Sequence, residues 1–289
     1  GERVSGEGFR KRQGAPWRRG SLERGWLSDG IGRLNKRVPK DVNHVLAIEP
    51  KQWSTSVTIQ TINPTTGDIS EHNEHSEGEV QAKLGQADQA FSQWRGVSLS
   101  ERSQAMSAAA EVLRRRRGEY AALITQEMGK PIGEAEAEID KCAWVCGYYA
   151  ENAAGFLAHQ PADIDDARSY VRFDPLGPVL SIMPWNFPFW QVFRFAAPAL
   201  MVGNVGLLKH ASNVPQCASA IEDIFRSAGF PDGAFISLRV GSDAIADLIG
   251  HPSVKAVTLT GSERAGEAVA AEAGDHLKKG WLELGGAEP

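Results

Sequence analysis

Between residues 177 and 284, short apolar runs alternate with segments of helical periodicity. Strands fit residues 177–183, 205–209, 234–238, 254–260 and 280–284, with helices between them. Strands that alternate with helices are joined by right-handed crossovers and form a parallel sheet. The sequence therefore predicts an α/β fold, a Rossmann-like parallel sheet with flanking helices, whose ligands bind at the carboxyl ends of the strands.

The region before this alternation is mostly helical. The stretch "INPTTGDIS" predicts a turn between two short β-like runs, because Asn63-Pro64 and Thr66-Gly67 are turn dipeptides. Helical periodicity follows at residues 79–94, 100–117, 119–128 and 132–156, with Ser100 as the expected N-cap of the second helix. The segment "SYVRFDP" predicts an exposed strand.

The first 55 residues differ in composition from the rest. Residues 1–50 contain eleven lysines and arginines against six acidic residues, a net charge of +5, whereas the whole chain carries −5. No period of 3.6 or 2 runs through this region, so we predict a disordered or non-native basic extension over residues 1–55. Arginines beside Trp17 and Trp26 could bind nucleic acid, but a solvated tail accounts for them, and no nucleic-acid partner is predicted.

Membrane and metal sites are not predicted. The apolar stretch 193–208 is interrupted by Pro198, Gly203, Asn204 and Gly206 and is too short to span a membrane, and the N-terminus has no apolar core typical of a signal peptide, so we predict a cytoplasmic protein. Three cysteines give no disulfide framework. Cys142 and Cys146 share a helix face, which favours core packing over a metal site.

The predicted strand ends carry polar residues but no GxGxxG motif. In "VTLTGSERAG", Gly261-Ser262 joins a strand to a helix, where free amides could bind a pyrophosphate or Ser262 could be an ordinary cap. Lys209 ends its strand and could reach a ribose or phosphate or point into water.

Two further segments combine apolar residues with one polar side chain each. In "MPWNFPFW", Asn186 is either an amide donor to an oxyanion or a buried asparagine that holds a turn. In "LELGGAEP", Glu283 stands in an apolar stretch before Gly285 and Gly286, which indicates a positioned acid with backbone passing close by.

Taken in order, "MPWNFP", "LLKHASN", "LTGSERAG" and "LELGG" resemble the aldehyde dehydrogenase superfamily. The segments "EMGKPIGEAEAEI" and "PWNFPFWQVFR" are most similar to its bacterial NAD(P)-dependent succinate-semialdehyde dehydrogenases. The resemblance implies that residues 56–289 are the N-terminal, NAD(P)-binding part of such an enzyme. It also implies that the catalytic cysteine and the catalytic domain lie beyond the end of this chain, so the predicted fold is incomplete.

The resemblance implies a mechanism. A cysteine thiolate attacks the aldehyde, an asparagine amide holds the oxyanion, hydride passes to nicotinamide, and a glutamate activates the water that hydrolyses the thioester. Asn186 matches the asparagine and Glu283 the glutamate. An apolar setting raises the basicity of such a carboxylate, and we expect Leu282 and Leu284 to provide it.

Cofactor contacts are also implied by the resemblance. They fall on Met183, Trp185, Lys209, Ser212, Gly241, Gly261 and Ser262. Ser212 stands where many members carry an acid that binds ribose hydroxyls, and His210 stands where proline is common. A carboxylate at position 212 would repel a 2′-phosphate, so we predict that the parent enzyme uses NAD or NADP.

Arg194 lies eight residues after Asn186 and, from a helix starting near Pro188, projects toward the same site. A guanidinium in apolar surroundings gains most from a carboxylate, which makes Arg194 the expected substrate anchor and succinate semialdehyde the expected substrate. Alternatively, Arg194 pairs with an acid of the missing domain.

None of the three cysteines matches the nucleophile, because Cys142, Cys146 and Cys217 all precede Glu283 and lie in helical contexts. We therefore predict that this chain does not oxidise aldehydes by itself, and that its full-length parent forms a homo-oligomer and acts on a small aldehyde. The alternative is a non-catalytic fragment that binds dinucleotide or pairs with other subunits.

Overall fold

The structure is a computed structural model that describes residues 58–162 and 169–285. Within these residues, five parallel strands form one sheet in the order β7-β6-β5-β8-β9. The strands are β5 (Pro178–Met183), β6 (Val205–His210), β7 (Phe235–Ser237), β8 (Ala256–Gly261) and β9 (Lys279–Leu284). The predicted sheet and its strands are therefore confirmed, each strand end lying within two residues of its expected place. The predicted extension over residues 1–55 lies entirely outside the described residues.

The strand order reverses direction beside β5, which is the first strand of the sheet along the chain and pairs with both β6 and β8. All six residues of β5 are buried, as expected of a strand covered on both faces. In sheets of this kind, ligands bind at the carboxyl ends of the strands where the order reverses. The topology therefore places the candidate site at the ends of β5 and its neighbours.

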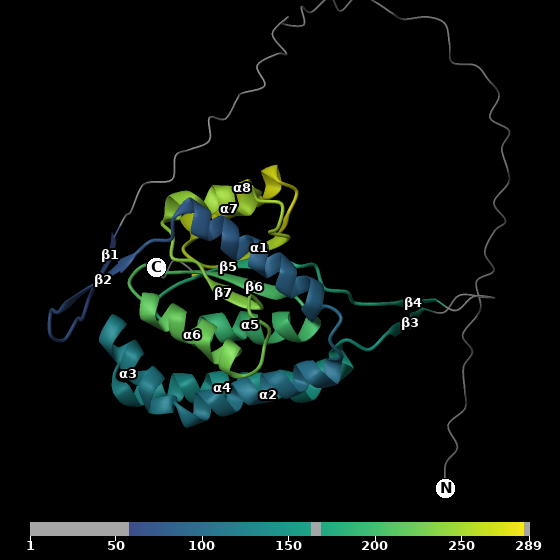
Figure 1. The fold of residues 1–289 in the computed structure, drawn as a ribbon, viewed down its shortest axis with the longest axis horizontal. Coiled ribbons are helices and arrows are strands. Elements are labelled where there is room, and N and C mark those ends of the chain that lie inside the picture. Colours follow the sequence, from purple (N-terminus) through teal and green to yellow (C-terminus); the bar gives the residue numbers. More distant parts are fainter. Residues whose placement is uncertain (1–57, 163–168, 286–289) are drawn as a thin grey trace, which may run out of the picture. The chain divides into compact units, whose positions relative to one another are not determined.

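Helices cover both faces of the sheet (Figure 1). One face is packed by α1 (Glu77–Trp94) and α8 (Glu263–Asp275), with α7 (Ile245–Gly250) against α8. The other is covered by α5 (Trp190–Val202) and α6 (Pro215–Ser227), against which a second helical layer packs. That layer consists of α2 (Leu99–Arg115), α3 (Arg117–Met128) and α4 (Ile132–Phe156). A short 3₁₀ helix, η1 (Ser242–Ala244), precedes α7.

Short antiparallel pairs stand outside the main sheet in the described part of the chain. β1 (Thr58–Ile62) pairs with β2 (Ile69–Asn73) around the predicted Asn-Pro turn, which is confirmed. β3 (Gln160–Ala162) pairs with β4 (Ser169–Val171), which confirms the exposed strand predicted at "SYVRFDP".

The start of α2 corrects one prediction. Ser98, and not Ser100, is the N-cap, because its hydroxyl accepts the Glu101 amide at 3.2 Å while the Glu101 carboxylate accepts the Ser98 amide at 3.1 Å. This reciprocal capping box requires a glutamate three residues after the serine. Ser98 is followed by Glu101 at this spacing, whereas Ser100 is followed by Ser103. α2 also ends at Arg115 rather than at residue 117.

Buried carboxylates join the second helical layer to α5 and α6. Glu138 of α4 is 4% exposed and accepts the amides of Phe189 and Trp190, at 2.8 and 3.0 Å. Its other oxygen forms an ion pair with buried Lys130. Each carboxylate oxygen therefore has a partner, and the negative charge lies at the positive start of α5.

Glu127 of α3 does the same for α6. It accepts the amides of Gln216 and Cys217 at 2.8 and 2.9 Å. Burial raises the pKa of this carboxyl group, whereas the two hydrogen bonds from backbone amides lower it. The first turn of α6 is thereby capped from another layer of the fold rather than by its own residues.

The end of α5 is held from α2. Arg102 donates from Nη1 to the carbonyls of Met201 and Val202, at 3.0 and 2.8 Å. Gly203 follows with φ of +104°, and a side chain there would lie 2.9 Å from the Arg102 guanidinium. Because both ends of α5 are bound by charged side chains of the second layer, the helix has a fixed position under β5.

We expect Glu138→Gln to lower the free energy of unfolding by roughly 3 kcal/mol, because it leaves Lys130 buried without its counter-charge. The measurement is urea-induced unfolding of the purified chain. Glu136→Gln is the matched control, since that partly exposed ion pair with Arg117 should contribute less than about 1 kcal/mol. Equal losses in the two variants would show that the buried pair has no special role.

Candidate functional site

The predicted site residues lie along the carboxyl edge of the sheet. Met183 ends β5, Lys209 is near the end of β6, and Gly261 ends β8. Trp185, Asn186, Ser212, Gly241 and Ser262 follow strands in the connecting loops, Glu283 lies in β9, and Arg194 lies in α5. Since the carboxyl ends of parallel strands meet at one edge, the topology gathers residues that are up to a hundred positions apart.

The loop "PWNFPF" is fastened from below by buried groups. Glu138 holds the amides at its end, and the Lys130 ammonium lies 3.7 Å from the centroid of the Phe187 ring. The Pro188 carbonyl bonds to Nε2 of His210 at 2.8 Å. These contacts fix the backbone, so the residues at the top of the loop have a defined direction.

Asn186 itself is exposed on this loop. Its Oδ1 accepts the amide of Phe187 at 3.0 Å, and its Nδ2 donates to no described residue. The interpretation as a buried asparagine that holds a turn is therefore wrong. Trp185 and Phe187 beside it are 49% and 46% exposed, so the described residues do not enclose Asn186. What the fold supplies is a free amide donor on a rigid loop.

His210 joins the ends of β5 and β6. Because a carbonyl only accepts, Nε2 donates to Pro188, and Nδ1 is left to accept the Ala211 amide at 2.9 Å. That amide also donates to the Met183 carbonyl at 3.0 Å. Burial lowers the pKa of His210 to about 4, so the ring is neutral near pH 7. In the sequence, only the unusual residue type at this position hints at the positioning role.

Lys209 lies near the carboxylate of Glu74, which no sequence motif marks. Burial lowers the pKa of the Lys209 ammonium, and the nearby Glu74 carboxylate raises it. Burial raises the pKa of Glu74, with a further increase from Asp243. A side chain at Gly241 would approach Glu74 Oε1 to 3.4 Å and would displace the exposed carboxylate of Asp243.

The loop with Glu74 is bound to the segment after β7. The amide of His75 donates to the Arg239 carbonyl at 2.7 Å, and the Arg239 amide donates to Nδ1 of His75 at 3.1 Å. Glu74 is far from Lys209 in sequence, and only the folded chain brings it to the ends of β6 and β7. No local pattern could have identified it.

Ser262 is the N-cap of α8, and its hydroxyl oxygen accepts the Ala265 amide at 3.3 Å. This is the geometry of an ordinary cap. The hydroxyl hydrogen and the first amides of the helix remain directed to solvent, since Ser262 and Glu263 are exposed. The helix start therefore keeps donors for an anion even though the serine caps it.

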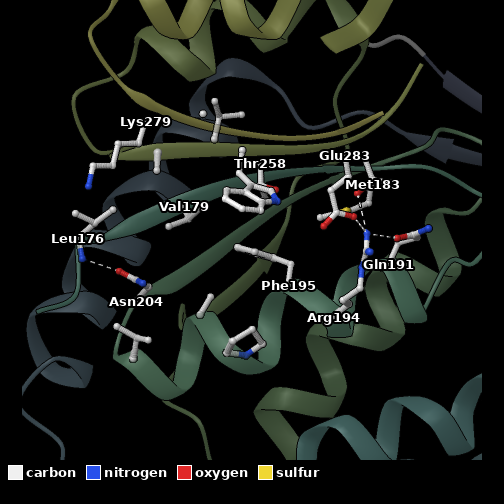
Figure 2. Close-up of a pocket in the computed structure, with 18 residues that line it drawn as sticks. Leu176, Val179, Met183, Gln191, Arg194, Phe195, Asn204, Thr258, Lys279 and Glu283 are labelled. Carbon is white, nitrogen blue, oxygen red and sulfur yellow. Dashed lines mark hydrogen bonds and ion pairs between the residues drawn. The ribbon is translucent and has the colours of Figure 1, made fainter. Parts of the chain in front are cut away.

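A cavity of about 580 Å³ lies between α5 and strands β5, β8 and β9 (Figure 2). Its walls are mostly apolar. Arg194 lies at one end beside Gln191 and Glu283, and Lys279 and Asn204 lie at the other end (Figure 2). Nη2 of Arg194 donates to Gln191 Oε1 at 2.8 Å, lies 3.4 Å from Thr260 Oγ1, and forms an ion pair with Glu283. Burial lowers the pKa of Arg194.

The surroundings of Glu283 correct another expectation. Successive residues of a strand point to opposite faces, so Leu282 and Leu284 do not enclose the carboxylate between them. Leu284 packs toward Gly266 of α8, whereas Glu283 faces the cavity. Leu282 and Leu284 therefore do not provide the expected apolar setting, and within this chain Arg194 pairs with Glu283.

The three cysteines are buried and free. Burial raises the pKa of each thiol, which confirms core packing and leaves none of them activated as a nucleophile. Among the described residues, no group of three His, Cys, Asp or Glu side chains could hold a metal ion. In the same part of the chain, no helix is both long enough and apolar enough to cross a membrane.

Comparison with known proteins gives concordant results. Residues 52–289 match the model of the aldehyde dehydrogenase family. The chain is 52% identical over 234 residues to a probable succinate-semialdehyde dehydrogenase [NADP(+)] of Synechocystis sp., a match that covers 81% of this chain and 52% of the relative. It is 48% identical over 235 residues to succinate-semialdehyde dehydrogenase [NADP(+)] 1 of Mycobacterium bovis, covering 80% of this chain and 51% of the relative.

A solved structure shares the fold. The crystal structure of succinic semialdehyde dehydrogenase from Streptococcus pyogenes in complex with NADP+ matches with a TM-score of 0.77 and 38% identity, covering 80% of this chain and 51% of that one. The chain thus spans about half the length of the curated relatives and solved structures that it matches.

The buried histidine predicts how stability depends on pH. The pKa of His210 is about 4 in the folded chain against an ordinary value of 6.5, so the unfolded chain takes up the proton first as the pH falls. The free energy of unfolding should therefore drop by roughly 3 kcal/mol between pH 6.5 and pH 4, and denaturant unfolding at a series of pH values measures it.

The His210→Gln variant should have a lower free energy of unfolding at pH 7.5. Between pH 6.5 and pH 4, its free energy of unfolding should depend less on pH than that of the unmodified chain. Some slope will remain, because burial also lowers the pKa of His75 to about 4. An unaltered slope in His210→Gln would contradict the assignment.

Proposed function

Because the chain belongs to the aldehyde dehydrogenase family, we propose that it is the dinucleotide-binding part of an enzyme that oxidises an aldehyde to a carboxylic acid with NADP or NAD. The observation that carries the proposal is the carboxyl edge of the sheet. There, Lys209, the exposed start of α8 and the rigid loop with Asn186 face the place where a parallel sheet of this order binds ligands.

The dinucleotide would be held by groups of three kinds. Lys209 supplies a positive charge for the ribose or its 2′-phosphate, and Ser262 with the first amides of α8 supplies donors for the pyrophosphate. Met183, Trp185, Ser212, Gly241 and Gly261 line the approach, the glycines by leaving room for it. The bound cofactor would accept the hydride. The names of the relatives support NADP, and so does the neutral residue at Ser212.

We propose succinate semialdehyde as the substrate of the full-length protein, which the names of the relatives support. The reaction consumes aldehyde, NADP and water and yields the carboxylate, NADPH and two protons. Asn186 would donate to the developing oxyanion, Glu283 would take a proton from the attacking water, and Arg194 would bind the distal carboxylate.

By itself this chain should not catalyse the reaction, because the buried thiols of its cysteines cannot serve as the nucleophile. The second candidate is a non-catalytic fragment that binds dinucleotide or pairs with other subunits. The exposed hairpin of β3 and β4, with Tyr170 at 44% and Val171 at 51% exposed, favours subunit pairing and, for the full-length protein, a homo-oligomer. Free cysteines support a reducing compartment such as the cytoplasm.

The test is cofactor binding by the purified chain, measured by titration calorimetry and by thermal unfolding. NADP and NAD should both stabilise the chain, since a ligand of the folded state raises the unfolding temperature. Ser212→Glu should weaken NADP binding by about tenfold or more, because the carboxylate repels the nearby 2′-phosphate. It should not weaken NAD binding, because the same carboxylate can accept hydrogen bonds from the ribose hydroxyls. Stabilisation by neither dinucleotide would contradict the proposed function.

Glu74 makes a separate prediction about cofactor choice. Its carboxylate lies near Lys209, so in Glu74→Gln the lysine should serve a 2′-phosphate better and NADP affinity should rise about threefold. NAD affinity should change little. Glu77→Gln, an exposed acid in the first turn of α1, is the control for general charge effects. A similar gain in the control would assign the change to net charge alone.

A further inference from the structure

The ion pair of Arg194 and Glu283 unites two residues to which the proposed function gives different tasks. Arg194 would bind the substrate carboxylate, and Glu283 would take a proton from water. In the structure, the carboxylate of Glu283 is bound to the guanidinium of Arg194 (Figure 2). Glu283 thus stands where a carboxylate ligand of Arg194 would have to bind.

The donor pattern of Arg194 makes the competition specific. A guanidinium can bind a carboxylate with two parallel bonds through Nη1 and Nη2 or through Nε and Nη2, and both arrangements use Nη2. In this structure Nη2 donates to Gln191 and to Glu283, with a longer contact of 3.4 Å to Thr260 Oγ1, while Nε and Nη1 donate to no described residue. A carboxylate that binds through two bonds must therefore displace Glu283 or Gln191.

The pair is exposed enough to be displaced. Arg194 and Glu283 are 37% and 38% exposed, and both line the cavity. An ion pair with this much access to water is worth little, in contrast to the enclosed pair of Lys130 and Glu138 at 7% and 1%. A carboxylate arriving through the cavity restores the charge contact of Arg194 and leaves Glu283 to water.

We infer that Glu283 is the resident occupant of the Arg194 carboxylate site and that a substrate carboxylate releases it. This inference rests on the proposed function and adds that substrate recognition and the freeing of the base are one event. A carboxylate held by a guanidinium takes a proton from water less readily than a free one. A semialdehyde brings the displacing group with it, whereas a neutral aldehyde of the same length leaves Glu283 paired.

The first measurement is calorimetric titration of the purified chain with succinate at constant ionic strength. Glu283→Gln keeps the shape of the side chain and removes its charge, so succinate affinity should rise about fivefold over the unmodified chain. Gln191→Ala should change the affinity less than twofold. Arg194→Leu should abolish binding, and butyramide, which has no charge, should bind all four proteins equally weakly.

The second measurement does not depend on succinate affinity. Phenylglyoxal modifies accessible arginines, and peptide mass spectrometry gives the rate at Arg194. Glu283→Gln should raise this rate severalfold, and succinate should lower it. Arg172, an exposed arginine on another part of the fold, is the internal control and should react equally in both proteins. Thermal unfolding verifies that each variant is folded.

The possible results separate the inference from the proposed function. Equal succinate affinity in Glu283→Gln and the unmodified chain, or a gain in Gln191→Ala alone, overturns the inference and leaves Arg194 as the anchor. Retained binding in Arg194→Leu overturns the anchor itself, and with it the proposed substrate. Succinate binding to none of the proteins overturns both, whereas dinucleotide binding continues to test the cofactor assignment. Unchanged modification of Arg194 in Glu283→Gln shows that the pair does not form and also overturns the inference.

Discussion

The arrangement of this fold depends on carboxylates placed inside it to cap helices of another layer. Glu138 and Glu127 are buried, and burial of a charged group is costly unless every lone pair finds a partner. Here the partners are the first amides of α5 and α6, which would otherwise lack acceptors. Each interaction therefore provides donors for a buried carboxylate and acceptors for the first amides of a helix. If the two layers shifted relative to each other, both groups would lose their partners.

The sheet could be predicted because its strands are short apolar runs with turn residues between them, a pattern that survives in any surroundings. The N-cap of α2 could also be predicted, since Ser98 and Glu101 have the spacing of a capping box. The prediction of Ser100 as the N-cap overlooks this spacing. Positions set by the local period were thus within reach of the sequence. Even the outward direction of Glu283 from its leucine neighbours follows from the strand period.

Contacts between distant segments could not be predicted from the sequence. Glu74 follows β2, yet it lies near Lys209 because two hydrogen bonds join His75 to Arg239, one between backbone groups and one to the imidazole of His75. Asn186 is exposed, and the buried carboxylate of Glu138, which binds the end of its loop, lies about fifty positions earlier in the chain. One buried acid did leave a trace: Glu138 stands on the same face of α4 as the core residue Cys142, four positions later.

The fixing of α5 at both ends has a geometric consequence for the proposed chemistry. Asn186 and Arg194 flank the start of this helix, and Arg102 at its far end prevents the helix from shifting along its axis. The separation between the group that would receive the reacting oxygen and the group that would receive the distal acid is thus constant. In the proposed function, a site of fixed span would discriminate between semialdehydes by the distance from the aldehyde to the carboxylate.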